Sequence, residues 1–140
     1  MKKSLLTILA ASVTLVFSSL LVAGGTPSAK GAMTYIISPQ HGEVVSSPFK
    51  VKFGLSGMGV APAGIDKKNT GHHHLLIDGK SIPNPDMKMG KAVKHFGGGQ
   101  TETTLSLSPG KHTLQLILGD KGHVQHKPPV ISQQITIMVE

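Results

Sequence analysis

The sequence predicts an all-β protein, a single antiparallel β-sandwich of about seven strands that follows an N-terminal signal sequence. Short alternating or apolar segments recur between turns rich in Gly and Pro, and no segment after the leader keeps helical spacing for three turns. The part after the leader, about 115 residues, has the length of one domain. Because the sequence contains no Cys, its core must stabilise the domain without disulfides.

Residues 1–25 have the features of a secretory signal. Lys2 and Lys3 give a positive start, residues 5–23 form an apolar run, and Ala23-Gly24-Gly25 offers small residues that suit a signal peptidase. The apolar run is also long enough for the alternative, an uncleaved membrane anchor. Either interpretation predicts an exported protein, periplasmic or secreted, with no membrane contact beyond this segment.

Residues 26–33 are small and polar, and we expect a flexible lead-in to a domain over residues 34–140. Six segments are expected to be its main strands, namely 34–37, 49–55, 72–78, 101–107, 111–118 and 130–139. The segment 49–55 alternates most clearly, with aromatic and aliphatic residues on one face and Lys and Gly on the other. Residues 81–99 are expected to form an irregular crossing with room for one short strand.

The segment from Leu105 to Leu114, with Pro109-Gly110 at its centre, resembles the corner between the fifth and sixth strands of immunoglobulin-like and fibronectin-like domains. Such domains often have a tyrosine where this chain has His112. We therefore expect His112 to be a hydrogen-bonded corner residue. The resemblance also implies which loops share an end of the sandwich.

Histidines gather at one of these ends. The loop before the 72–78 strand, the start of the 101–107 strand and the loop after the 111–118 strand all belong there. Six of the eight histidines thus converge, together with one methionine of the first loop, while His41 and His112 lie at the opposite end. The candidate metal ligands are His72, His73, His74, His95, His123, His126 and Met58.

The triple histidine is expected to divide between the faces of its strand. Apolar residues that follow it place His73 on the core face and His72 and His74 on the outer face. Two imidazoles at positions i and i+2 of a strand lie on one face, about 7 Å apart at the backbone. We expect two of the three to be joined by a histidine of the last loop, with His95 or Met58 completing the ligand set.

Imidazole and thioether donors without a thiolate argue against a structural zinc knuckle or a blue-copper centre. In an exported protein these donors favour copper over zinc or nickel. The alternative is a structural or interaction domain whose histidine-rich loops form a hydrogen-bonded platform for an exported protein or a glycan. A pH-responsive or organic-ligand site is a third interpretation.

Two functional classes are disfavoured. The basic residues are all lysine, and aromatic residues make up 4% of the chain, whereas nucleic-acid recognition depends on arginine and stacking aromatics. We therefore expect no nucleic-acid partner. With no Cys, no nucleophile elbow and no pair of catalytic carboxylates, no catalysis is expected either. A copper-dependent redox activity is the one enzymatic alternative.

Several motifs together are distinctive: GHHHLLID from Gly71 to Asp78, HFGGGQTE from His95 to Glu102, and HTLQL from His112 to Leu116. With GVAPAG at 59–64, Gly119-Asp120 and the segment 123–129, they are similar to a bacterial domain-of-unknown-function family, number 4399. The similarity extends over nearly the whole chain after the leader. It implies an exported bacterial domain but no settled activity. The general shape also resembles small periplasmic copper-binding sandwiches, although their ligand spacings are not present.

Overall fold

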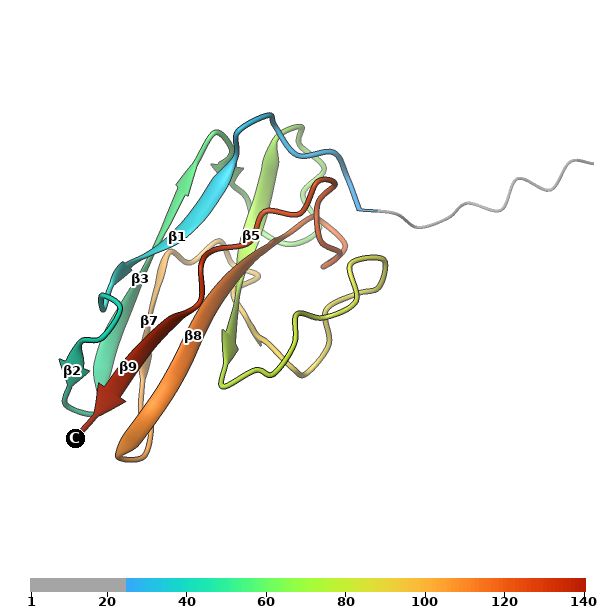
Figure 1. The fold of residues 1–140 in the computed structure, drawn as a ribbon. Coiled ribbons are helices and arrows are strands. Elements are labelled where there is room, and N and C mark those ends of the chain that lie inside the picture. The colour runs from blue at the N-terminus through green and yellow to red at the C-terminus, as the bar shows by residue number, and fades with distance from the viewer. Residues whose placement is uncertain (1–24) are drawn as a thin grey trace, which may run out of the picture.

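The computed structural model describes residues 25–140, which contain nine β-strands (Figure 1). Apart from Gly25, the expected signal sequence over residues 1–25 lies outside the described residues. The strands are β1 Met33–Ser38, β2 Val44–Val45, β3 Phe49–Ser56, β4 Gly59–Val60, β5 Thr70–Ile77, β6 Lys94–His95, β7 Glu102–Leu105, β8 Gly110–Gly119 and β9 Ile135–Val139. Within residues 25–140, no helix has the length and hydropathy needed to span a bilayer.

The strands form two sheets. One has the order β1-β3-β7, and the other has the order β2-β9-β8-β5-β4 with β6 paired to β5. This is an immunoglobulin-like arrangement, in which β1, β3 and β7 oppose β5, β8 and β9. The predicted all-β sandwich is therefore confirmed. The short pairs β2–β9 and β4–β5 are parallel, which the prediction of a wholly antiparallel sandwich did not include.

The main core lies between the two sheets. β3 alternates as predicted, burying Phe49, Val51 and Phe53 and exposing Lys50 and Lys52. The opposing sheet contributes Leu75, Leu114, Leu116, Ile137 and Val139. Burying one such side chain stabilises the fold by about 1.5–3 kcal/mol. β5 and β8, which position the site, are thus fixed by the most buried part of the molecule.

A second, smaller hydrophobic cluster covers the outer face of β5 and β8. Leu76 of β5 and Ile117 of β8 are buried there against Met89 and Val93, with Ile82 and Ile131 packed at the edge. The residues between β5 and β6 supply most of this cover, although the sequence predicts only an irregular crossing for them. As a result, β5 is buried on both faces.

The last strand is shorter than predicted. β9 begins at Ile135, whereas the sequence predicts a strand from residue 130. Ser132 interrupts the pairing with β8, because its hydroxyl accepts a hydrogen bond from the N–H of Leu116 at 2.8 Å while its own N–H donates to the Leu116 carbonyl at 2.9 Å. A side chain thus replaces one backbone acceptor, and the regular ladder resumes only three residues later.

The lead-in, expected to be flexible, is bonded to the loop after β8. The N–H of Ser28 donates to the carbonyl of Lys127 at 3.0 Å, and the N–H of Lys127 donates to the carbonyl of Thr26 at 3.0 Å. Figure 1 shows this blue segment running beside the orange-red loop between β8 and β9. The chain therefore enters the domain at the end that carries most histidines.

The opposite end contains the two remaining histidines. His112 lies 2.9 Å from the carbonyl oxygen of Ser108 through Nε2 and 2.7 Å from Oδ2 of Asp78 through Nδ1. His41 accepts a hydrogen bond from the N–H of Thr136 at 3.1 Å. The prediction that His112 is a hydrogen-bonded corner residue is confirmed.

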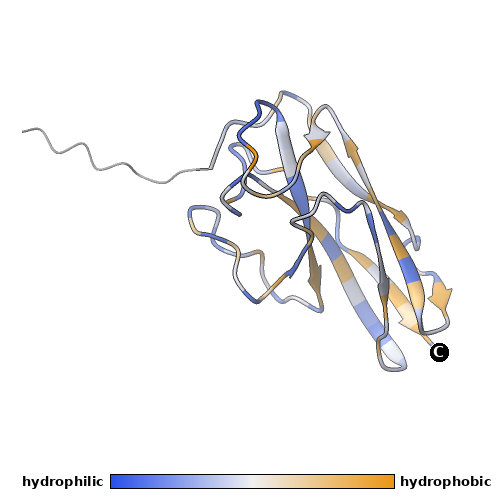
Figure 2. Cartoon of the chain, turned by 180° about the vertical axis from the view of Figure 1, so that it is seen from behind, coloured by the Kyte–Doolittle hydropathy of each residue, from blue (hydrophilic) through white to orange (hydrophobic). Residues whose placement is uncertain are grey.

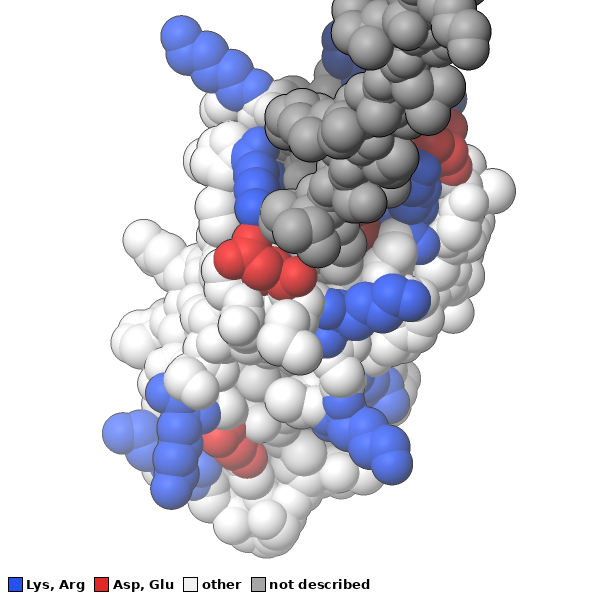
Figure 3. Space-filling view, turned by 90° about the vertical axis from the view of Figure 1, so that its right-hand side faces the viewer, with Lys and Arg blue, Asp and Glu red and all other residues white. Residues whose placement is uncertain are grey.

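Lysines are spread over the surface. On the face shown in Figure 3 they surround a few acidic side chains. Lys121 pairs with Asp66, and Lys127 pairs with Asp86 at 2.6 Å. These exposed pairs stabilise the fold little, about 0–1 kcal/mol each.

Candidate metal centre

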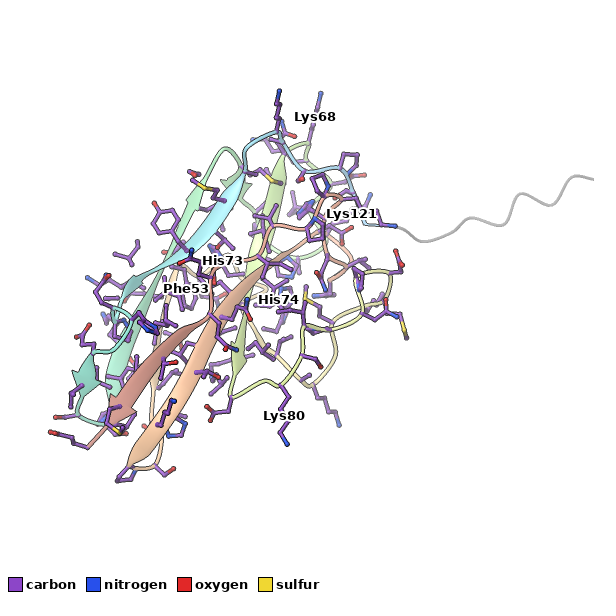
Figure 4. All side chains as sticks on the ribbon, in the orientation of Figure 1. Phe53, Lys68, His73, His74, Lys80 and Lys121 are labelled. Atoms are coloured by element: carbon purple, nitrogen blue, oxygen red, sulfur yellow. The ribbon has the colours of Figure 1, made fainter. Side chains whose placement is uncertain are left out.

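The triple histidine lies inside β5, where alternation sends its side chains to opposite faces. His73 lies between the sheets, with its ring 5.3 Å from that of Phe53 and its Nδ1 3.4 Å from Oγ1 of Thr34. His72 and His74 share the outer face, with ring centroids 4.7 Å apart. Figure 4 shows His73 and His74 on opposite sides of the strand, and Figure 2 shows β5 changing from hydrophilic at its histidines to hydrophobic beyond them. The structure has the division that the sequence predicts.

Two more histidines reach the outer face. His95, the last residue of β6, pairs directly with His74, and their ring centroids are 5.1 Å apart. His123, from the loop between β8 and β9, has its ring centroid 5.0 Å from that of His72 and 4.5 Å from that of His95. One ring nitrogen from each of these four residues lies within 4.8 Å of the others. We call His72, His74, His95 and His123 the four-histidine cluster; within residues 25–140, no other group of His, Cys, Asp or Glu converges in this way.

Two glycines make room for the rings. Gly119 lies opposite His72 on β8, and a Cβ atom there would be 2.4 Å from Cε1 of His74. A Cβ atom on Gly97 would be 2.2 Å from Cε1 of His95. Neither distance is physically possible, so any other residue at these positions would displace an imidazole. The sequence does not reveal this role of the two glycines, because space left for a ring from a distant residue produces no periodic pattern.

Asp120 shapes the loop that carries His123. Its buried carboxylate accepts hydrogen bonds from the N–H groups of Gly122 and Val124 at 2.8 and 3.0 Å through Oδ1, and from that of Thr26 at 3.1 Å through Oδ2. His123 has a φ of 67°, a left-handed conformation that costs of order 1 kcal/mol for a residue with a side chain. The bonds to Asp120 hold this conformation, which turns the imidazole toward the cluster.

The ring nitrogens of the cluster have few hydrogen-bond partners. Nε2 of His72 lies 3.1 Å from Nδ1 of His123. The Nδ1 atom of His72 and both ring nitrogens of His74 are buried without any partner in the protein. Leaving a buried polar group unpaired costs about 1–3 kcal/mol. The cluster is therefore poorly explained as a self-contained hydrogen-bond network.

The cluster favours neutral imidazoles. Burial, followed by the neighbouring His123, lowers the pKa of His72 to about 4. Burial, followed by the neighbouring His72, lowers the pKa of His74 to about 3. The pKa of His95 is lowered by burial and by His123. At neutral pH these rings keep the lone pairs that metal coordination requires.

The geometry is compatible with an ion. Two nitrogen ligands of a tetrahedral ion, at about 2.0–2.1 Å from it, lie roughly 3.3 Å from each other. The 3.1 Å between His72 and His123 is close to this separation, and the spread of up to 4.8 Å within the cluster calls for small ring rotations. Four imidazole nitrogens with no thiolate and no carboxylate among them could thus hold a metal ion.

The remaining candidates lie elsewhere. His73 is on the core side of β5. His126 is buried, with Nδ1 3.1 Å from Oγ1 of Thr26, and its Nε2 lies 2.7 Å from where a Cβ of Gly71 would be. Because Gly71 and His73 share a face of β5, His126 belongs to the core side too. Met58 is half-buried in the turn between β3 and β4.

Comparisons with known proteins place the chain in context. A family model described as "Domain of unknown function (DUF4399)" matches residues 51–140, a range that contains the whole four-histidine cluster. No curated protein matches the sequence. Among solved structures, the fibronectin(III)-like modules of Clostridium thermocellum CbhA are similar to this chain, with a TM-score of 0.39 and 13% identity over 76% of this chain and 93% of theirs.

Proposed function

We propose that this chain, which belongs to the DUF4399 family, is an exported metal-binding module whose four-histidine cluster binds copper. The observation that carries the proposal is the convergence of four ring nitrogens within 4.8 Å on a face where three buried ring nitrogens of His72 and His74 have no hydrogen-bond partner in the protein. A bound ion would satisfy lone pairs that the protein itself leaves unpaired.

Copper is preferred on the chemistry of the donors. Imidazole suits copper, zinc and nickel, and divalent copper binds most tightly to a given nitrogen site in the Irving–Williams order. The chain has no Cys, so the thiolates typical of structural zinc sites are lacking. Zinc and nickel are the competing ions.

The alternative, a hydrogen-bonded platform for a protein or glycan, is supported by one contact, the 3.1 Å approach of His72 to His123. It accounts less well for His74, whose two ring nitrogens are buried and unpaired. The two functions differ in their response to a chelator. A platform keeps its thermal stability in a chelator, whereas a copper module loses the stabilisation that a bound ion supplies.

The experiment is a titration of the protein, purified without a polyhistidine tag, with Cu(II), Zn(II) and Ni(II). His95→Ala removes one ligand from an exposed position, and His72→Ala/His123→Ala removes two. His41→Ala, at the far end, is the matched control. We expect tight binding of one Cu(II) in the wild type and the control, weaker binding in His95→Ala and weaker still in the double variant. Equal affinity in all four proteins would overturn the proposal.

Export is supported by the sequence of the first residues, with Lys2-Lys3 before an apolar run and small residues at 23–25. Cell fractionation and N-terminal sequencing test it. We expect the protein outside the cytoplasm, beginning near residue 26 if the signal is cleaved. An intact N-terminus in the membrane fraction indicates the anchor instead, and an intact protein in the cytoplasm contradicts export.

A further inference from the structure

Among the methionines of residues 25–140, Met89 is the one that the structure ties to the four-histidine cluster in two ways. Its backbone N–H donates a hydrogen bond to the carbonyl of His123 at 2.8 Å. Its side chain reaches the space above Gly119. A Cβ atom added to Gly119 would be 2.9 Å from Cε of Met89 and 2.9 Å from Nδ1 of His74. The thioether end and an unpaired imidazole nitrogen therefore face the same small volume.

Met89 is buried, and its ability to turn the sulfur comes from the flexibility of its own side chain. The side chain is 7% exposed and belongs to the small hydrophobic cluster with Leu76 and Ile117. A methionine has three rotatable bonds, so its stem can stay in this cluster while the sulfur rotates toward the imidazoles. Met87, two residues earlier, is 63% exposed and has no such position.

A sulfur ligand distinguishes between the two oxidation states of copper. A thioether is a soft ligand that favours Cu(I), whereas imidazole also serves Cu(II), Zn(II) and Ni(II). On the basis of the proposed function, we propose that Met89 is a Cu(I)-specific ligand, so that the cluster holds Cu(II) with imidazoles alone and Cu(I) with imidazoles and the Met89 sulfur. Met89 thereby determines which oxidation states of copper the site retains.

The test compares Met89→Leu with Met87→Leu as the matched control. Leucine has a similar volume and keeps the packing of the small cluster. Under anaerobic conditions, competition with a chromophoric Cu(I) chelator should show a loss of Cu(I) affinity of about tenfold or more in Met89→Leu, equivalent to about 1.4 kcal/mol. The Cu(II) affinity of Met89→Leu and both affinities of Met87→Leu should match the wild type.

A spectroscopic readout separates ligation from packing. In protein labelled with selenomethionine and loaded with Cu(I), X-ray absorption at the copper edge should show a copper–selenium distance in the wild type and none in Met89→Leu. If Met89→Leu does not fold, the Met58→Leu/Met87→Leu variant, which keeps Met89, must retain the signal. Its loss there would assign the sulfur to another methionine and overturn the inference.

The two proposals fail in different ways. If the copper affinity of the wild type is no higher than that of His72→Ala/His123→Ala, the proposed function fails and the inference fails with it. If the wild type binds copper while Met89→Leu has unchanged Cu(I) affinity and an unchanged absorption spectrum, only the inference is overturned.

Discussion

Gly119 and His74 lie on neighbouring strands and share one small volume. A Cβ atom on Gly119 would be 2.4 Å from Cε1 and 2.9 Å from Nδ1 of His74. The backbone of Gly119 does not have a positive φ, so space and not backbone conformation requires a glycine at this position. The site thus requires a residue without a Cβ atom at position 119 of β8.

Replacing Gly119 with alanine should therefore damage both stability and metal binding. The methyl group must push the His74 ring or β8 aside, and we expect a loss of about 1–3 kcal/mol, as for other overpacked positions. Gly122→Ala is the control, because the nearest atom to a Cβ there is 3.5 Å away. Urea denaturation of the metal-free proteins and Cu(II) titration measure the two effects. A Gly119→Ala protein that matches Gly122→Ala in both would contradict this account.

Asp120 should support the metal site without being a ligand. Asp120→Ala leaves the N–H groups of Gly122 and Val124 without their acceptor, at a cost of about 1–3 kcal/mol if they stay buried. His123 is then free to leave its left-handed conformation, so Cu(II) affinity should fall together with the free energy of unfolding. Denaturation and titration of the same preparation test both.

Asp66→Ala provides the comparison for Asp120→Ala. Asp66 contacts the same loop only through an exposed ion pair with Lys121, which is worth about 0–1 kcal/mol. Removing the Asp66 carboxylate should change neither the Cu(II) affinity nor the free energy of unfolding appreciably. If the two variants lose Cu(II) affinity equally, loss of negative charge near the site, and not loss of loop structure, is the cause.

The corner formed by His112 and Asp78 should make stability depend on pH. The hydrogen bond to Asp78 raises the pKa of His112. Burial acts to raise the pKa of Asp78, but hydrogen bonds from Thr113 and His112 outweigh it and lower that pKa. The contribution of His112 to the free energy of unfolding is fully present below the ordinary histidine pKa of about 6.5, and it is lost as pH rises through the raised pKa of His112.

Asp78→Asn isolates this contribution. Asparagine tolerates the φ of 53° at this position and keeps an oxygen for the N–H of Thr113. Because the pair is partly exposed, we expect destabilisation of at most about 1 kcal/mol near pH 5.5 and less near pH 8.5. Urea denaturation at both pH values measures it. Glu102→Gln is the control, because it breaks an exposed pair with Lys50 that contains no histidine; its loss in free energy of unfolding should be the same at both pH values. An equal loss at both pH values in Asp78→Asn would refute the link between His112 and the pH dependence.

Local pattern was enough to predict much of the fold. The alternation of β3 and the turn before β8 placed the strands, and the same alternation separated His73 from His72 and His74. Strand order in an immunoglobulin-like domain then placed His95 and His123 at the same end. These predictions worked because they depend on side-chain direction along a strand, a property that the sequence shows directly.

Other features depend on contacts between distant residues. The sequence places His72 on the outer face of its strand but does not show that this face is covered; His72 is fully buried, because the segment before β6 folds over that face around Leu76 and Ile117. The place of Met89 beside His74 follows from the same fold-over. His126, grouped with the other histidines by its position in the chain, instead faces the core side of β5. No spacing rule predicts how an irregular segment packs.

The four-histidine cluster draws its members from β5, β6 and the loop after β8. A bound ion would link residues 72 and 123 by coordination, at positions as distant in the sequence as those that a disulfide can join. Because only the folded chain brings these histidines together, the ion would stabilise the fold by mass action, by about 2.7 kcal/mol when its free concentration is one hundred times Kd. A protein without cysteine would thus have a reversible cross-link, which forms or opens with the supply of an ion and does not depend on an oxidant.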